Sequence, residues 1–522
     1  MAAQEEQIMK KNTKIFIVVA VAAVLLIGLM LLLIFLPKGD SEGSATYDEG
    51  VKMTVSTDAN GVHQAEIITD ENGNIENNSY GTLVEYDTNK ISTIHIENSK
   101  GTLDITSYTP KNEKGETDTT VYTIKGYEDF ELQQGVADTI ATAASHLDFS
   151  KVITLDKDKA SEYGFDKPRS TVTITYEDKT KAVVYVGEDA PQSAGTYIRF
   201  GDGDAVYLVE TDSVSVFDYG LTDLMSLTIN DSATNSDNSQ ASSITLSGTS
   251  FGSEIELVPN NDGKNSASYR ITKPNEGYAS ESESSLVEGA IRGLYAESVK
   301  MVNPSSNQLS ELGLSTPYAE VKAVYPDITV DVISSKPDGE GKVYIMEKGG
   351  KVVYVMASAN LPWVTTSYEK LVSEYVLSPK MTSLSQVSIN DGNKTYDFNL
   401  SSKEVTSTDN EGSETTTTQT SVKCNDKEIE LSYFSTLFQN ISYTELADND
   451  SESAGGTPVL TITYTYSADN SSDTVSFYET GANRYVASVN GTSVGHVHKS
   501  NINKAVKQIA DVAANKQIDS VF

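Results

Sequence analysis

The longest apolar run in the chain covers residues 15–36, where Gly28 is the one residue that is not strongly apolar. A helix of this length rises about 33 Å, enough to cross a hydrocarbon core of about 30 Å. Three lysines precede the run, whereas Lys38 alone follows it, together with several acidic residues. Because positive charge stays on the cytoplasmic side, the pattern predicts a transmembrane helix over 15–36, a cytoplasmic tail over 1–14 and an extracytoplasmic remainder.

Beyond this run, apolar and polar residues alternate in short segments, which is the pattern of half-buried strands. One such segment, at 91–96, recurs at 241–246 and again at 384–389. A second marker, Gly-Phe/Leu-x-x-Pro, occurs at 164–168 and 313–317. The first two copies of each marker lie about 150 residues apart, and a fixed period of this kind indicates internal duplication. The sequence therefore predicts repeated modules.

We expect three modules after a polar stalk over 37–89, which carries Asn-Gly turns typical of hairpins. Polar composition predicts a linker at 230–240. A second polar segment, the Ser/Thr/Glu-rich insertion at 401–421, is either a long hairpin tip or disordered. The predicted modules span residues 90–229, 241–379 and 382–522.

Each module is expected to contain two helices. Apolar spacing of three and four predicts a first helix in each module and a second that closes it. The first helices are expected at 134–147, 284–302 and 432–443, and the closing helices at 213–227, 367–376 and 501–514. Gly164 and Gly313 of the marker should take a left-handed turn after a helical stretch. The predicted fold class is α+β: one N-terminal transmembrane helix, then three repeated modules of antiparallel sheet with packed helices.

The charge and the cysteine content of the chain limit which partners and which cross-links are possible. The chain carries 39 basic and 74 acidic residues, a formal charge of −35. Nucleic acid is excluded as a partner, because phosphate binding needs a basic face. Cys424 is the one cysteine, so no disulfide forms within the chain.

Three segments carry residue types that could bind a metal. His496 and His498 alternate on a predicted strand and could hold zinc together, but no Cys or carboxylate stands at ligand spacing, which favours a solvated strand. The segment 70–74 resembles a fragment of a calcium loop, yet its glycine is misplaced, which favours a turn. Asp202 and Asp204 flank Gly203, and the corresponding place in the second module carries lysines, so a hairpin tip is the simpler interpretation.

The remaining candidates are a nucleophile and an aromatic residue. Cys424 has no histidine near it in sequence, so a strand residue is favoured over a catalytic thiol. Trp363 could contact a ligand, but core packing at the start of the closing helix is favoured. The chain has no phosphate-binding Gly-x-x-x-x-Gly-Lys-Ser/Thr loop. We assign no catalytic, cofactor-binding or metal-binding residue.

The repeated marker carries a family resemblance. The sequences at 163–168 and 312–317, each followed by two strand tyrosines, resemble a bacterial domain of unknown function found beside gliding-motility-type ABC transporters. The tyrosines are Tyr197 and Tyr207 in the first module, and Tyr344 and Tyr354 in the second. The resemblance covers about Asn89 to the C-terminus and is weaker in the third module, where the marker is reduced to 455–458. It implies a membrane-tethered auxiliary protein of a transport or envelope system, with no catalytic residues to carry over.

The leading expectation is a single-pass, non-enzymatic protein that presents sheet edges and hairpin tips to a membrane complex such as an ABC transporter. Every repeated position found is a packing or turn residue, which favours this interpretation. Two alternatives remain at this point. A cell-surface glycan- or peptide-binding module predicts clustered exposed aromatic residues, and an envelope hydrolase predicts a pocket where histidines and carboxylates converge.

Overall fold

The computed structural model of the chain describes residues 50–75, 77–111, 119–232, 240–408, 414–448, 452–481 and 483–520. The predicted transmembrane segment, 15–36, and the predicted tail, 1–14, lie outside these residues. Within the described ranges, no helix combines the length and apolar character needed to cross a bilayer.

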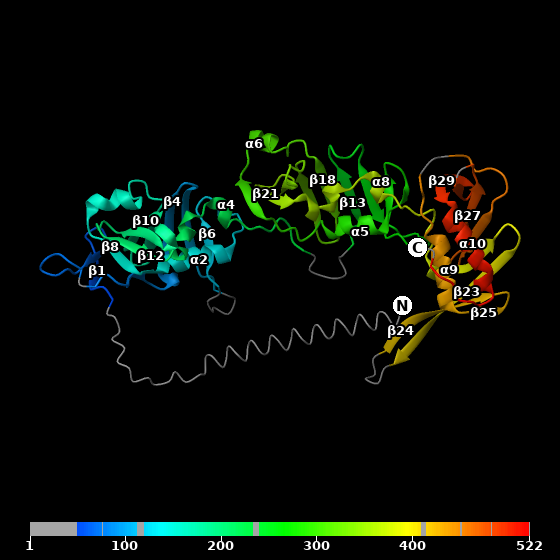
Figure 1. Cartoon of the computed structure of the whole chain (residues 1–522), viewed down its shortest axis with the longest axis horizontal. Helices are drawn as coiled ribbons and strands as arrows, with labels where there is room; N and C mark the ends of the chain where they lie inside the picture. The colour runs from blue at the N-terminus through cyan, green and yellow to red at the C-terminus, as the bar shows by residue number, and fades with distance from the viewer. Residues whose placement is uncertain are drawn as a thin grey trace.

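Three large antiparallel sheets follow one another along the chain and lie in a row (Figure 1). The first has eight strands in the order β6-β5-β4-β9-β10-β11-β12-β8. Their bounds are β4 (Ile91–Asn98), β5 (Gly101–Tyr108), β6 (Val121–Ile124), β8 (Lys151–Thr154), β9 (Ser170–Tyr176), β10 (Lys181–Asp189), β11 (Thr196–Phe200) and β12 (Val206–Val209). Its helices are α2 (Gln134–Ser145), α3 (Asp212–Ser215) and α4 (Leu221–Leu224). Two small sheets flank it: β1 (Met53–Thr57) pairs with β2 (His63–Ile67), and β3 (Gly81–Glu85) pairs with β7 (His146–Phe149).

The second sheet has nine strands in the order β16-β15-β14-β13-β18-β19-β20-β21-β17. Their bounds are β13 (Ser243–Ser247), β14 (Ile255–Pro259), β15 (Tyr269–Lys273), β16 (Gly277–Tyr278), β17 (Ser298–Val302), β18 (Ala319–Val324), β19 (Thr329–Ser334), β20 (Lys342–Glu347) and β21 (Val352–Ala357). Its helices are α5 (Glu281–Gly289), α6 (Ser306–Glu311), α7 (Pro362–Thr365) and α8 (Tyr368–Leu371).

The third sheet has eight strands in the order β25-β24-β23-β22-β26-β27-β28-β29. Their bounds are β22 (Leu384–Asn390), β23 (Thr395–Thr408), β24 (Glu414–Cys424), β25 (Lys427–Ile429), β26 (Leu460–Tyr466), β27 (Ser472–Glu479), β28 (Arg484–Val489) and β29 (Thr492–His498). Its helices are α9 (Leu431–Ser442) and α10 (Lys499–Ala513).

The three sheets share the topology of their central strands. In each, a first meander is followed by a helix, and the chain then returns to pair beside the first strand of that meander. These central pairs are β4 with β9, β13 with β18, and β22 with β26. The recurring sequence segment thus lies on the central strand of every sheet, where alternating burial requires its alternating pattern.

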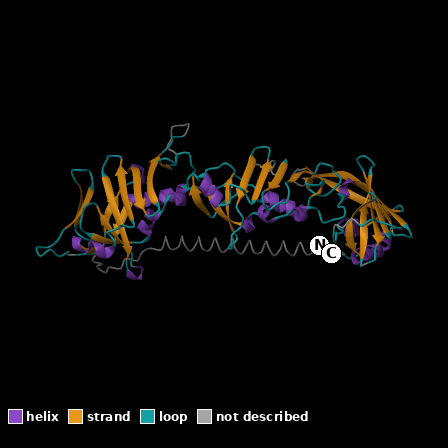
Figure 2. Cartoon of the chain, turned by 90° about the horizontal axis from the view of Figure 1, so that it is seen from above, coloured by secondary structure: helices purple, strands orange, loops and turns teal. Residues whose placement is uncertain are grey.

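The hydrophobic cores follow from this alternation. In β9 and β26, every second residue is buried, and the helices α2 and α9 contribute apolar residues to the same cores. Figure 2 shows most helices along one side of the row of sheets. The apolar core of the first sheet continues into that of the second, whereas the core of the third sheet forms a separate cluster.

Three of the predicted helices differ from the structure. The helix expected at 284–302 ends at Gly289, Gly293 takes a left-handed φ of 69°, and 298–302 instead forms strand β17. The helix expected at 213–227 is broken where Gly220 is extended. The helix expected at 367–376 ends after Leu371, because Val372 pairs with Ala279 of the second sheet. The other three predicted helices are present with ends within three residues.

The predicted fold class is wrong for the described residues. We expected an α+β fold headed by a transmembrane helix. The described chain is mostly antiparallel sheet, and most of its helices have fewer than ten residues. Strands dominate because the Ser-, Thr- and Tyr-rich segments alternate with a period of two.

Candidate functional site

A long two-stranded ribbon extends from the third sheet. Strands β23 and β24 have 14 and 11 residues, and they pair with each other from Phe398 with Cys424 to Thr408 with Glu414. Figure 1 shows the end of the ribbon reaching past the body of the third sheet. The sequence left two alternatives for 401–421, and the described part of this segment is a hairpin.

Both outer edges of the ribbon lack a neighbouring strand. β22 pairs with β23 over residues 395–399, and β25 pairs with β24 over residues 422–424. Among the described strands, residues 400–408 and 414–421 therefore pair only with each other. A free strand edge presents a row of backbone N–H and C=O groups that can pair with another chain.

The sequence explains why this ribbon forms and why it is left uncovered. Threonine is β-branched and favours strands, and four threonines follow one another at 415–418. The apolar residues that would bury a face are almost absent, so the ribbon has little to pack on the core. At its base, the hydroxyl groups of Ser402 and Thr420 lie 3.1 Å apart and form a cross-strand hydrogen bond.

A groove opens beside the free edge of β24. Its volume is about 590 Å³, and it is lined by residues 419–421 of β24, by Ser401 and Lys403 of β23, by the turn from β25 into α9, and by Asn515. Strand β25 ends at Ile429 and pairs only with residues 422–424 of β24. A strand from another chain could therefore pair with the rest of the same edge of β24, in line with β25. We call the ribbon and this groove together the ribbon site; a free strand edge is the kind of surface to which extended segments add in other proteins.

His496, for which the sequence favoured a solvated strand over a zinc site, is instead buried and bonded to two carboxylates. Its Nδ1 lies 2.6 Å from Oδ1 of Asp448, and its Nε2 lies 2.8 Å from Oε2 of Glu452. These two bonds raise the pKa of the buried imidazole, which favours its protonated form. His498 is exposed at the start of α10. No group of three metal-ligating residues occurs in the part of the chain that the structure describes.

The two acidic candidates are turns. One carboxylate oxygen of Asp70 accepts hydrogen bonds from the backbone N–H groups of Asn72 and Asn74, which lowers the Asp70 pKa and closes a tight loop. Asp202 donates its backbone N–H to Gln64 Oε1 at 2.8 Å. The hairpin tip that carries Asp202 therefore packs against β2.

Cys424 and Trp363 lie in the hydrophobic core. Cys424 is 1% exposed, and burial is the main cause that raises the pKa of its thiol, which opposes a nucleophilic role. Trp363 is fully buried, and its Nε1–H donates to the carbonyl oxygen of Ala290 at 3.1 Å. The interpretation of Trp363 as a core residue is confirmed.

The family comparison gives two matches. The model described as Domain of unknown function (DUF4340) matches residues 123–288 and 270–456. The matches begin in β6 and β15, which occupy equivalent places in the first two sheets. No curated protein and no solved structure matches the chain significantly. The two matches together cover more than half of the sequence, so the chain belongs to the family of repeated domains described as Domain of unknown function (DUF4340).

Proposed function

We propose that this protein is a non-enzymatic docking subunit that works outside the cytoplasm and binds a membrane complex through the ribbon site. The observation that carries the proposal is the pair of free strand edges at 400–408 and 414–421. Stable proteins usually shorten, charge or cover such edges, because they promote association. A long free edge beside a groove therefore supports a role in binding an extended segment of a partner.

The location rests on the sequence. The apolar run at 15–36, with lysines before it and acidic residues after it, supports export of everything that follows and attachment to the membrane. The resemblance to proteins encoded beside gliding-motility-type ABC transporters supports a transport complex as the partner. The charge of −35 supports a partner surface that is neutral or basic.

The proposal can be tested by shortening the ribbon. Residues 403–419 are replaced by Asn-Gly, a two-residue turn that joins the paired residues Ser402 and Thr420. The described residues in the removed stretch form strand pairs only with each other, so the variant should keep the melting temperature of the full chain within a few degrees. Both proteins are cross-linked in native membranes, and the partners are identified by mass spectrometry.

We expect the full chain to recover a membrane transport complex and the shortened variant to lose it. A matched control shuffles residues 414–421 among themselves, which keeps the strand edge and its composition. Strand addition reads the backbone, so the shuffled variant should still bind. Equal recovery with and without the ribbon would refute the proposal, and recovery of wall glycan alone would favour a glycan-binding module.

A further inference from the structure

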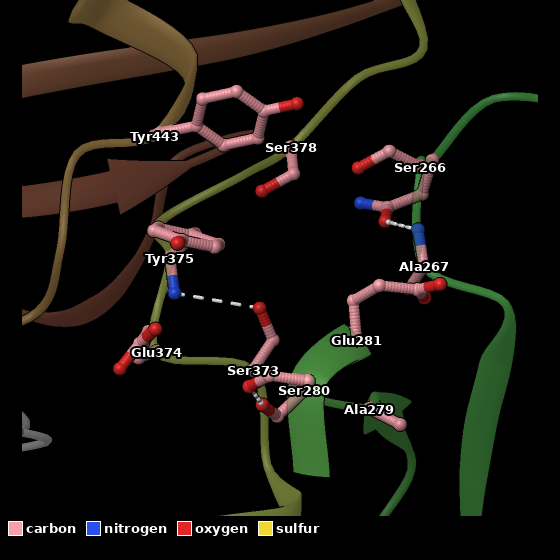
Figure 3. A pocket seen from close by; sticks show the side chains of 12 residues that line it. Ser266, Ala267, Ala279, Ser280, Glu281, Ser373, Glu374, Tyr375, Ser378 and Tyr443 are labelled. Carbon is pink, nitrogen blue, oxygen red and sulfur yellow. Dashed lines mark hydrogen bonds between the residues drawn. The ribbon is translucent and has the colours of Figure 1, made fainter. Parts of the chain in front are cut away.

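A second cavity lies where the second sheet meets the third. Its volume is about 450 Å³, which is within the range of small-ligand sites. Its walls come from the start of α5, from the segment that connects the two sheets, and from Tyr443 directly after α9 (Figure 3). We call it the junction cavity.

The ends of the connecting segment, 371–380, are fixed to the second sheet. At one end, the N–H of Ser280 donates to the carbonyl oxygen of Leu371 at 2.7 Å. At the other end, the N–H of Lys380 donates to the carbonyl oxygen of Lys264, also at 2.7 Å.

The middle of the same segment is bound to the third module instead. The N–H of Val376 donates to the carbonyl oxygen of Thr444 at 3.0 Å. The N–H of Leu446 donates to the carbonyl oxygen of Glu374 at 2.7 Å. The segment is thus drawn away from the second sheet between its two fixed ends. The junction cavity is the space that this arrangement leaves, and its walls are held by backbone hydrogen bonds on both sides.

One buried side chain in this cavity is unsatisfied. Ser378 is 6% exposed, and its hydroxyl group has no hydrogen-bond partner among the described residues. In Figure 3, this hydroxyl lies beside the rings of Tyr375 and Tyr443. Buried polar groups are nearly always paired in folded proteins. An unpaired hydroxyl that faces a cavity is available to bond with whatever occupies that cavity.

Most residues that line the cavity are serines, alanines and an asparagine, and the larger lining residues are two tyrosines and two glutamates. The rings of Tyr375 and Tyr443 have centroids 5.2 Å apart and are tilted by 56°. Glu281 and Glu374 also line the cavity, and the described lining residues include no lysine, arginine or histidine. The Glu281 carboxylate is held in place by the N–H and hydroxyl of Ser268, at 2.6 and 2.7 Å.

We propose that the junction cavity binds an alkylammonium group, carried either by a small free amine or by a lysine side chain of a partner. Tyrosine faces attract ammonium groups, and desolvation strengthens this attraction. The carboxylates supply opposite charge, and the Ser378 hydroxyl supplies a further hydrogen-bond acceptor. An anionic ligand would be repelled by the same carboxylates. This inference is independent of the docking role of the ribbon.

Calorimetric titration of the full chain tests the proposal. The probes are 1,5-diaminopentane, as a free amine, and Nα-acetyl-lysine methylamide, as a lysine side chain, both at constant ionic strength. We expect saturable binding of one amine per chain for at least one probe. Ser378→Ala should weaken that binding about tenfold, because a hydrogen bond to a charged group is lost. The same variant should melt at the same temperature as the wild type or higher, since the hydroxyl makes no bond in the free protein.

Two variants separate specific binding from general attraction to an acidic protein. Glu281→Gln removes one charge in the cavity, and Glu162→Gln removes one exposed charge in the first module. Binding that falls only with Glu281→Gln and Ser378→Ala supports the proposal, and the probe that binds identifies the source of the ammonium group. The proposal is overturned if neither amine shows saturable binding, or if the neutral sugar N-acetylglucosamine binds in place of the amines. It is also overturned if Glu162→Gln weakens amine binding as much as Glu281→Gln does, or if Ser378→Ala leaves amine binding unchanged.

Discussion

Replacement of Trp363 by phenylalanine tests how the second module is held together. Trp363 lies in α7, is fully buried and is the only tryptophan in the chain. Its indole N–H is bonded to the carbonyl oxygen of Ala290, one residue after the end of α5. The side chain therefore ties the two helices together across the core.

The expected loss has two parts. Phenylalanine buries about 50 Å² less than tryptophan, which corresponds to about 1.2 kcal/mol at about 25 cal/mol per Å². The carbonyl oxygen of Ala290 loses its indole donor, and a buried group left without a partner costs about 1–3 kcal/mol. Together these changes should lower the local stability of the second module by about 2–4 kcal/mol.

Hydrogen exchange read by mass spectrometry measures this loss sheet by sheet. We expect faster exchange in the second sheet, a partial effect in the first sheet, which shares its core, and no change in the third. A matched control, Phe434→Leu, lies in the separate core of the third sheet and should show the opposite distribution. A loss below about 1 kcal/mol in the second sheet, or an equal loss in the third, would contradict the reasoning.

Three further predictions concern single residues. The thiol of Cys424 should react with a disulfide reagent only after unfolding, because it is buried and its pKa is raised, and complete labelling of the native chain within minutes would contradict this. The carboxylates of Asp448 and Glu452 raise the His496 pKa, so the stability that His496 adds is fully present below about pH 6.5 and is lost as pH rises through the raised value. The difference in melting temperature between wild type and His496→Gln should therefore shrink with rising pH, and a difference that grows would contradict it. Gly201→Ala should destabilise the first module by about 1–2 kcal/mol or more in thermal unfolding, because φ is 60° and a Cβ would meet the His63 carbonyl oxygen at 2.5 Å; an unchanged melting temperature would refute this.

The sequence predicted features that depend on local patterns. The alternating segments at 91–96 and 384–389 lie on central strands, and Gly164 and Gly313 take the expected left-handed conformation. The repeated domain of unknown function is confirmed by two family matches. These features could be predicted from the sequence because an alternating strand pattern and a glycine with positive φ each depend on only a few neighbouring residues.

Features that depend on distant contacts were not predictable. Residues 298–302 form a strand because the edge of β21 is available to pair with them, which no local pattern indicates. The composition of 401–421 left a long hairpin tip and disorder as alternatives, and the lack of a further strand beside the described residues 400–408 and 414–421 is a property of the finished sheet. The junction cavity depends on Tyr375 and Tyr443 meeting across two modules, and their separation in sequence gave no signal.

The central claim is that an extended segment of a partner adds to the ribbon edge. A photo-activated cross-linking amino acid, placed in turn at each position from 414 to 421 in the full chain in cells, tests this most directly. The claim predicts cross-links to one membrane transport protein from successive positions along β24, and none from equivalent replacements in β9 at the centre of the first sheet. Cross-links that are absent from the whole of 414–421, or that appear equally from β9, would contradict it.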